Sequence, residues 1–261
     1  MKRVGKCTAT AVIAVAALLA ISSRAALTSF RRTPVDRLGH LPHVMLWAWE
    51  RREDLSFIDP QRVGVAYLAG TLHLSGDRVL MRPRLQPLVV PHNAVMVAVI
   101  RIEADRLPAP TMSPHQRADA ARAIARVADH SPAAIQIDFD ATRSQRVFYR
   151  DLLADVRNRL PPAMPLSITA LASWCIYDDW IADLPIDEAV PMLFRMGADS
   201  MAIDQYLQKG GDFAPALGRY SVGISTDEPA RAIPAGRRVY IFSPHAWTDE
   251  SVATAIAEAA Q

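Results

Sequence analysis

The feature that most constrains the fold is a series of eight short, apolar, strand-like runs that recur along the chain after residue 43. Their ranges are 44–50, 63–69, 94–103, 133–140, 165–174, 188–194, 220–225 and 238–244. Helix-like segments separate several of these runs. They cover residues 115–130, which Ser113 and Pro114 precede as a cap and a first-turn proline, 144–160, with apolar residues near helical spacing, and 248–260, which Thr248 caps. Strands that alternate with helices predict parallel pairing through right-handed crossovers.

Eight such strands in a domain of about 220 residues fit a (β/α)8 barrel of the TIM type, an α/β fold. An open, doubly wound sheet is the alternative, but no glycine-rich phosphate loop follows any of the runs, and we expect no cofactor. The second crossover is irregular, because residues 71–92 alternate polar and apolar side chains around Ser75, Gly76 and Asp77. We therefore predict a β-hairpin inserted after strand two, over or beside the barrel mouth, where a helix would be regular.

The first residues have the pattern of a secretory signal. Residues 1–25 begin with three basic residues, continue through an uncharged apolar stretch from about residue 9 to 21, and end in small residues. An uncleaved membrane anchor is the alternative, since the stretch is only slightly shorter than the roughly 20 residues of a spanning helix. Residues 26–42 then form a linker and 43–261 a single barrel domain. The expected location is outside the cytoplasm, secreted or periplasmic, with a tether to the inner membrane if the segment is retained.

Charge and cysteine content narrow the classes of partner. Residues 1–25 hold four basic residues and no acid, so their removal lowers the formal net charge from +2 to −2. No clustered basic run remains, which argues against a nucleic-acid partner. Only Cys175 remains, so the domain forms no internal disulfide and has no cysteine-based metal site. The histidines lack the spacing of metal ligands, and no metal site is predicted.

Five segments of the chain, spread over roughly residues 43–245, carry a resemblance to known proteins: "LWAWER", "VAVIRIEA", "IQIDFDATRSQRVFY", "LSITALASWC" and "VPMLFRMG". Together they resemble a bacterial family of secreted proteins that is grouped with glycoside-hydrolase-like barrels and carries a domain-of-unknown-function label. The resemblance implies a barrel fold and a general carbohydrate chemistry, but it implies no established substrate. The "DFD" at 138–140 also resembles the acidic strand-four motif of chitinase-type barrels. That motif ends in a glutamate two residues further on, where this chain has Thr142.

Polar and aromatic side chains gather at the predicted strand ends, where barrel enzymes place their working residues. In the run 133–140, Ile135, Ile137 and Phe139 share one face and should meet the helices, so that Asp138 and Asp140 point inward. The candidate catalytic residues are Asp140, Asp138 and Glu103. The candidate substrate-binding residues are Trp47, Glu50, Arg101, Arg143, Trp174, Arg195 and Trp247.

These residues predict cleavage of a glycosidic bond by two carboxyl groups, one protonated and one ionised. We assign Asp140 as the acid or base nearest the mouth and Glu103 as its partner. Two other functions stay open: a non-catalytic glycan-binding barrel, which the threonine at 142 favours, and an envelope scaffold that binds another protein. A structural role is also open for each acid, as a partner of Arg101 or Arg195, and Trp47 and Trp174 could be core residues instead of sugar platforms.

Overall fold

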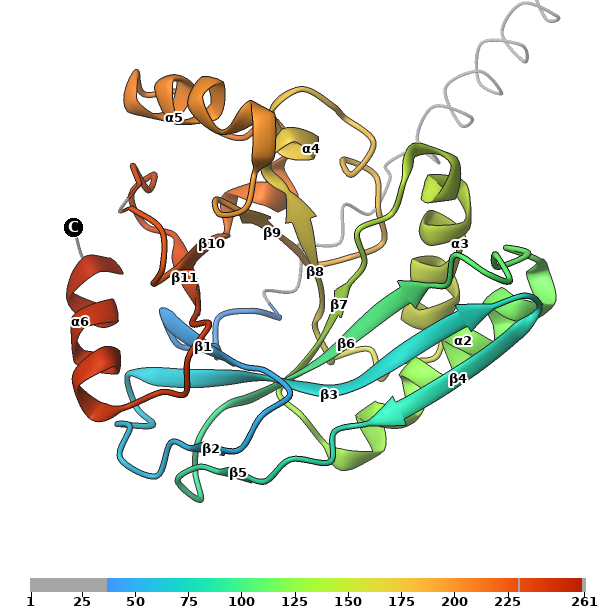
Figure 1. Ribbon diagram of the computed structural model, residues 1–261, viewed down its shortest axis with the longest axis horizontal. Coiled ribbons are helices and arrows are strands. Elements are labelled where there is room, and N and C mark those ends of the chain that lie inside the picture. The colour runs from blue at the N-terminus through green and yellow to red at the C-terminus, as the bar shows by residue number, and fades with distance from the viewer. Residues whose placement is uncertain (1–36, 230, 260–261) are drawn as a thin grey trace, which may run out of the picture. The chain divides into compact units, whose positions relative to one another are not determined.

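The computed structural model describes residues 37–229 and 231–259 (Figure 1). The predicted signal segment 1–25 and the first part of the predicted linker lie outside the described residues. Eight parallel strands form a closed barrel, since each pairs with the next along the chain and β1 pairs with both the second strand and the last. They are β1 (Val44–Ala48), β3 (Val63–Ser75), β6 (Met96–Ala104), β7 (Ala134–Asp138), β8 (Leu166–Leu171), β9 (Glu188–Met192), β10 (Ser221–Ser225) and β11 (Arg238–Phe242). The barrel prediction is confirmed, and the open sheet is wrong.

The α-helices surround the barrel and follow the later strands (Figure 1). They are α2 (Pro114–Ala125), α3 (Arg146–Arg157), α4 (Ala172–Ile176), α5 (Ser200–Gln208) and α6 (Asp249–Ala259). Short 3-10 turns lie at Arg126–His130, Arg143–Gln145, Gly197–Asp199 and Ala216–Arg219. The predicted cap of α2 is present, because the Ser113 hydroxyl accepts a hydrogen bond from the Gln116 amide at 3.1 Å. In the described part of the chain, no helix lies between β1 and β6, so the first two connections between barrel strands contain no helix.

Two apolar layers follow from the alternation of side chains along the strands. Ile135, Ile137 and Phe139 point outward into the core between the barrel and the helices, and the Phe139 ring packs edge-on against Tyr149 of α3 at 5.1 Å. The predicted orientation of this strand is thereby confirmed. The inner layer holds Met45, Trp47, Ala66, Val97, Val99, Val190 and Tyr240. Val147, in the segment expected to form an apolar stripe, is 73% exposed, because Phe148 and Tyr149 take the buried face of α3.

The irregular second crossover differs in detail from the predicted inserted hairpin. Strand β3 is 13 residues long, turns at Gly76 and Asp77, and pairs antiparallel with β4 (Arg78–Pro83). Gly76 has a φ of +55°, which a glycine adopts without strain. The first arm of the hairpin is thus the barrel strand itself, not a separate insertion. Further on, β5 (Leu88–Val89) pairs in parallel with β2 (Glu53–Asp54), and residues 71–92 contain no helix.

The segment just before β1 belongs to the folded domain. Leu38 and Leu41 are buried in the inner apolar layer. The Arg238 guanidinium donates hydrogen bonds to the carbonyls of Leu38 and Pro42, both at 3.0 Å. Residues 37–42 therefore cover the N-terminal end of the barrel, and this part of the predicted linker is packed. No helix in the described ranges is long and apolar enough to cross a membrane.

Candidate active site

A pocket of about 240 Å³ opens at the carboxyl ends of the barrel strands. This is the end at which (β/α)8 enzymes carry their chemistry. Its lining combines two carboxyl groups, two guanidinium groups and several large aromatic side chains. The lining residues are Trp47, Trp49, Arg101, Asp138, Asp140, Thr169, Leu171, Met192, Phe194, Arg195 and Phe242.

Asp138 is the last residue of β7 and lies at the back of the pocket, only 7% exposed. Its Oδ1 accepts a hydrogen bond from the Thr169 hydroxyl at 2.7 Å, and its Oδ2 accepts one from Arg101 at 3.2 Å. Burial raises the pKa of Asp138 above its ordinary value, and the nearby charge of Asp140 acts in the same direction. The bonds from Thr169 and Arg101 oppose this shift without reversing it. Asp138 therefore holds its proton more tightly than a carboxyl group in water.

Asp140 lies two residues further along the same face and is exposed at the pocket rim. The alternation that points Phe139 toward the helices points Asp138 and Asp140 into the mouth. One strand end thus presents a buried carboxyl group and an accessible one to the same pocket. A ligand in the pocket can touch Asp140 directly, whereas Asp138 is already engaged by its neighbours.

Aromatic side chains form much of the pocket surface. Phe194 and Phe242 are stacked with ring centroids 5.7 Å apart and planes 2° from parallel. Trp49 packs edge-on against Phe242 at 6.3 Å. Trp47 is 3% exposed and forms the floor, with its indole stacked on Tyr240 at 5.3 Å. Such faces are suited to the apolar sides of planar or ring-shaped ligands.

Two arginines complete the lining. Arg101 donates to Asp138 and also, at 3.1 Å, to Glu103, and its guanidinium lies 5.9 Å from the centre of the Trp49 ring. Arg195 follows β9 with a φ of +52°, an uncommon conformation for a residue with a side chain. Its backbone amide donates to Glu228 at 2.7 Å, and its guanidinium lies 5.1 Å from the centre of the Phe242 ring. Arg195 is largely exposed and can reach a ligand at the rim.

The floor rests on a buried polar chain that crosses the barrel interior. The Trp47 indole donates to Gln136 at 2.9 Å, and the Gln136 amide donates to Ser167 at 3.2 Å. Ser167 in turn donates at 2.9 Å to Glu188, which is fully buried. These groups satisfy one another's hydrogen bonds and fix the orientation of the Trp47 ring.

Five of the residues predicted for the site lie outside the pocket lining, and three of these are charged. Glu103 sits on β6 beyond the mouth, where it pairs with Arg101 and faces His73 at 3.6 Å. Glu50 accepts a hydrogen bond from the Leu85 amide at 3.2 Å. Arg143 is exposed at the start of the 3-10 turn after β7. None of them is among the pocket residues.

Two of the three tryptophans assigned to substrate binding are buried behind the strands. Trp174 is 5% exposed on α4, where its ring contacts Trp180 at 5.0 Å. Trp247 is 4% exposed, and its indole donates to the Trp47 carbonyl at 3.0 Å. Both belong to the outer core between the barrel and the helices. They pack the fold and do not line the mouth.

The sequence-based assignment of the site did not include Phe194, Phe242 and Trp49. Each continues the inward alternation of its strand, from Met192, Tyr240 and Trp47 respectively. The sequence could have revealed them, because residues two positions apart on a strand point to the same side. The assignment passed over the two phenylalanines because an apolar residue at a strand end looks like core.

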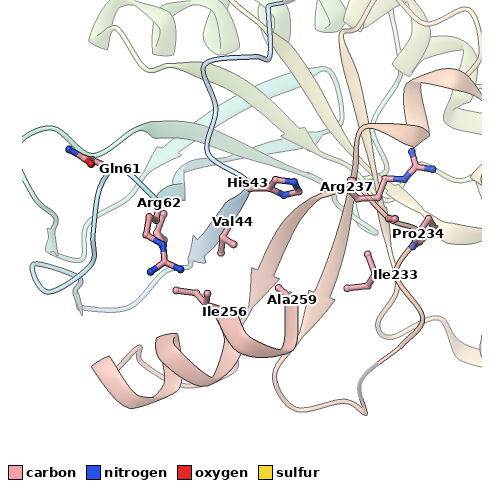
Figure 2. A pocket seen from close by; sticks show the side chains of 12 residues that line it. His43, Val44, Gln61, Arg62, Ile233, Pro234, Arg237, Ile256 and Ala259 are labelled. Carbon is pink, nitrogen blue, oxygen red and sulfur yellow. The ribbon is translucent and has the colours of Figure 1, made fainter. Parts of the chain in front are cut away.

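A second cavity, of about 580 Å³, opens at the N-terminal end of the barrel, beside the start of β1 and along α6 (Figure 2). Figure 2 shows Val44, Ile256 and Ile233 around it, with the Arg62 side chain beside Ile256. Its lining contains no carboxyl group, in contrast to the mouth pocket. Within residues 37–229 and 231–259, no group of three or more acidic, histidine or cysteine side chains is placed to hold a metal ion.

Comparison with known proteins finds one matching family profile and several solved structures with a similar fold. Residues 93–190 match the profile of a domain of unknown function, DUF3142. No curated protein is significantly similar to the chain in sequence. Among solved structures, the "putative Chitinase A" from Streptomyces coelicolor superposes with a TM-score of 0.54 at 10% identity, covering 83% of this chain and 95% of that one.

Two further structures are more distant. The chitinase domain of the spore coat protein CotE from Clostridium difficile gives a TM-score of 0.43 at 13% identity, with 73% of this chain and 66% of that chain covered. The spore cortex-lytic enzyme SleL from Bacillus cereus gives 0.45 at 16% identity, and the match spans 70% of this chain and half of that one. The likeness to the Streptomyces structure, at 10% identity, shows the fold alone. The chain spans just under two thirds of the CotE domain.

Proposed function

We propose that the mouth pocket binds a carbohydrate and that the protein is a glycoside hydrolase acting on a poly- or oligosaccharide outside the cytoplasm. One observation carries the proposal: Asp138, at the end of β7, and Asp140, two residues beyond it, share the pocket with the rings of Trp49, Phe194 and Phe242. Aromatic rings stack on the apolar faces of sugars, and a pair of carboxyl groups is the chemistry that most glycosidases use. The location outside the cytoplasm rests on the signal pattern of residues 1–25 alone.

The two carboxyl groups have different environments, which suits different roles. Asp140 is accessible, so it is the group that gives a proton to the oxygen of the leaving sugar and recovers one from the attacking water. Asp138 is buried and held by Thr169 and Arg101. Burial raises the pKa of Asp138, so this group can hold a proton at a higher pH than a carboxyl group in water. Asp138 is thus a positioning and charge-tuning residue in this scheme.

Binding without cleavage is a second candidate, and two observations favour it. Thr142 stands where the chitinase-type motif has its acid, and the Thr142 amide and hydroxyl are engaged in the local turn with Gln145 and Ser144. Glu103, the predicted partner of Asp140, does not line the pocket. The aromatic lining would serve a glycan-binding protein equally well.

An assay with a matched pair of variants separates the two candidates. The protein is incubated with a panel of polysaccharides, and products are detected by mass spectrometry. Asp140→Asn should lower turnover by about 100-fold or more, the usual contribution of a positioned acid or base, while binding persists because the amide is nearly isosteric. Asp129→Asn, an exposed carboxylate away from the mouth, should leave turnover unchanged. Retained binding with no product from the unmodified protein would establish the second candidate instead.

A further inference from the structure

Two neighbouring barrel strands continue well past the mouth. Strand β3 has 13 residues and β6 has nine, whereas the other barrel strands have five or six. In the register of the sheet, Thr71, Arg101 and Asp138 lie at one level, and β7 ends there. The residues of β3 beyond this level, 72–75, project by about 13 Å at the usual rise of a strand. Together with 102–104 of β6 and the antiparallel β4, they form a three-stranded sheet extension.

The outer face of the sheet extension is packed against the domain. Leu72, Leu74 and Ile102 are buried in the same core as Ala121 of α2. The side chain of Gln116, also on α2, donates hydrogen bonds to the carbonyls of Gly76 and Arg78, both at 3.0 Å. Figure 1 shows β3 and β4 as a long ribbon that runs beside α2. The extension is therefore a fixed wall and not a loose hairpin.

The inner face of the sheet extension continues the surface of the mouth pocket. Cross-strand partners share a face, so His73 lies between Leu80 of β4 and Glu103 of β6. One level below, Thr71 lies between Arg82 and Arg101, and Arg101 itself lines the pocket. The inner face thus leads from the pocket to the tip of the extension without a break.

Apart from Thr71, which is 4% exposed, the side chains on this face are accessible, and they are rich in hydrogen-bonding groups. Ion pairs run outward from the pocket, from Asp138 to Arg101 and then to Glu103. His73 follows, 3.6 Å from Glu103 and 3.8 Å from Asp105. Glu103 is 44% exposed, and Leu80 beside His73 is 65% exposed. A row of carboxylates, a guanidinium and an imidazole beside an apolar side chain matches the mixture of hydroxyl groups and apolar faces along a sugar chain.

We infer that the inner face of the sheet extension binds the part of a glycan chain that leaves the pocket, so that the ligand is a polysaccharide and not a short saccharide. The inference rests on the proposed function. The pocket, at about 240 Å³, is smaller than the roughly 300–1,000 Å³ that encloses a drug-sized ligand, so it holds only one end or one short section of a chain. The remaining sugars need a surface that adjoins the pocket, and the extension supplies one.

The test compares chain lengths. Hexasaccharides and disaccharides of the chito, cello and manno series are titrated calorimetrically against the protein and three variants. The extension variant combines His73→Ser, Leu80→Ser and Arg82→Ser, the pocket variant is Trp49→Ala, and the control is Tyr220→Ser. Tyr220 is a half-exposed aromatic residue beside the N-terminal end of β10, at the opposite end of the barrel.

The unmodified protein should bind a hexasaccharide at least about tenfold more tightly than the disaccharide of the same series, a preference worth about 1.4 kcal/mol. The extension variant should lose this preference and bind the disaccharide as before. Trp49→Ala should weaken both ligands, and Tyr220→Ser neither. If the triple variant does not fold, as judged by circular dichroism, Leu80→Ser alone should reduce the preference in the same sense.

Failure of this inference and failure of the proposed function would give different results. Equal affinity of the unmodified protein for both lengths, or an unchanged preference in the extension variant, would overturn this inference and leave the proposed function standing. Absence of binding to every probe would overturn both.

Discussion

Replacing Glu188 with alanine tests whether the buried polar chain supports the barrel. Glu188 is the first residue of β9 and is fully buried. Its carboxylate accepts hydrogen bonds from Arg238 at 2.8 Å, Ser167 at 2.9 Å and the Tyr240 hydroxyl at 3.0 Å. Removing one partner of a buried ion pair destabilises a protein by about 3–5 kcal/mol, because the other charge is left uncompensated. Arg238 keeps its hydrogen bonds to the carbonyls of residues 38 and 42, so we expect about 3 kcal/mol for Glu188→Ala.

Two further variants separate the charge from the packing. Glu188→Gln keeps the shape and one acceptor oxygen, and should lose about 1–2 kcal/mol, since hydrogen bonds to charged groups are stronger than neutral ones by roughly this amount. Asp129→Ala, at an exposed site, should change the free energy of unfolding by less than about 0.5 kcal/mol. Urea denaturation followed by tryptophan fluorescence measures all three, with an unchanged dependence on denaturant showing that the unfolding transition is the same. A loss below about 1 kcal/mol for Glu188→Ala would refute the reasoning.

Three other predictions concern the site and the outer core. Because burial raises the pKa of Asp138 above its ordinary 3.8, this group stabilises the fold most below pH 3.8, and the contribution is lost as the pH rises through the folded-state pKa. Asp138→Asn should therefore gain stability relative to the unmodified protein in urea titrations from about pH 3.5 to about pH 7, and a constant or falling difference would contradict this. Trp174→Ala should lower the free energy of unfolding by about 3–5 kcal/mol without weakening glycan binding by the folded fraction, whereas Trp49→Ala should do the reverse. Cys175 is fully buried and burial strongly raises the pKa of its thiol, so it should react with a thiol reagent only when the protein is unfolded, and fast labelling of the native protein would show the site to be open.

The orientation of β7 could be predicted from the sequence, because the alternation of side chains along a strand is a local property. Residues 133–140 alternate between Ile135, Ile137 and Phe139 on one side and polar residues on the other. Only the apolar side can meet the helices, so the acids had to face inward. The eight runs between helical segments then left little choice of fold. These inferences need no knowledge of how far each strand extends.

The extent of each strand is what the sequence did not reveal, and it accounts for two of the misplaced residues. Glu103 has the same parity as Arg101, but β3 and β6 support each other past the mouth and carry Glu103 out of the pocket. Trp174 was placed on a strand over residues 165–174, whereas β8 ends at Leu171 and α4 turns the indole into the outer core. Both errors come from pairing between distant segments, which decides where a strand ends.

The position of a residue along the barrel axis also decides whether an inward-facing side chain belongs to the pocket or only stabilises the fold. Gln136, Asp138 and Glu188 all point inward, and parity alone treats them as equivalent. Glu188 begins its strand and lies at the closed N-terminal end, where Arg238 and residues 37–42 enclose it. Asp138 ends its strand and opens into the pocket. A buried carboxyl group at the closed end can only stabilise the fold, whereas one at the open end beside an accessible Asp140 can take part in proton transfer. The position of each acid along its strand therefore decides which inward-facing acid serves the fold and which serves the site.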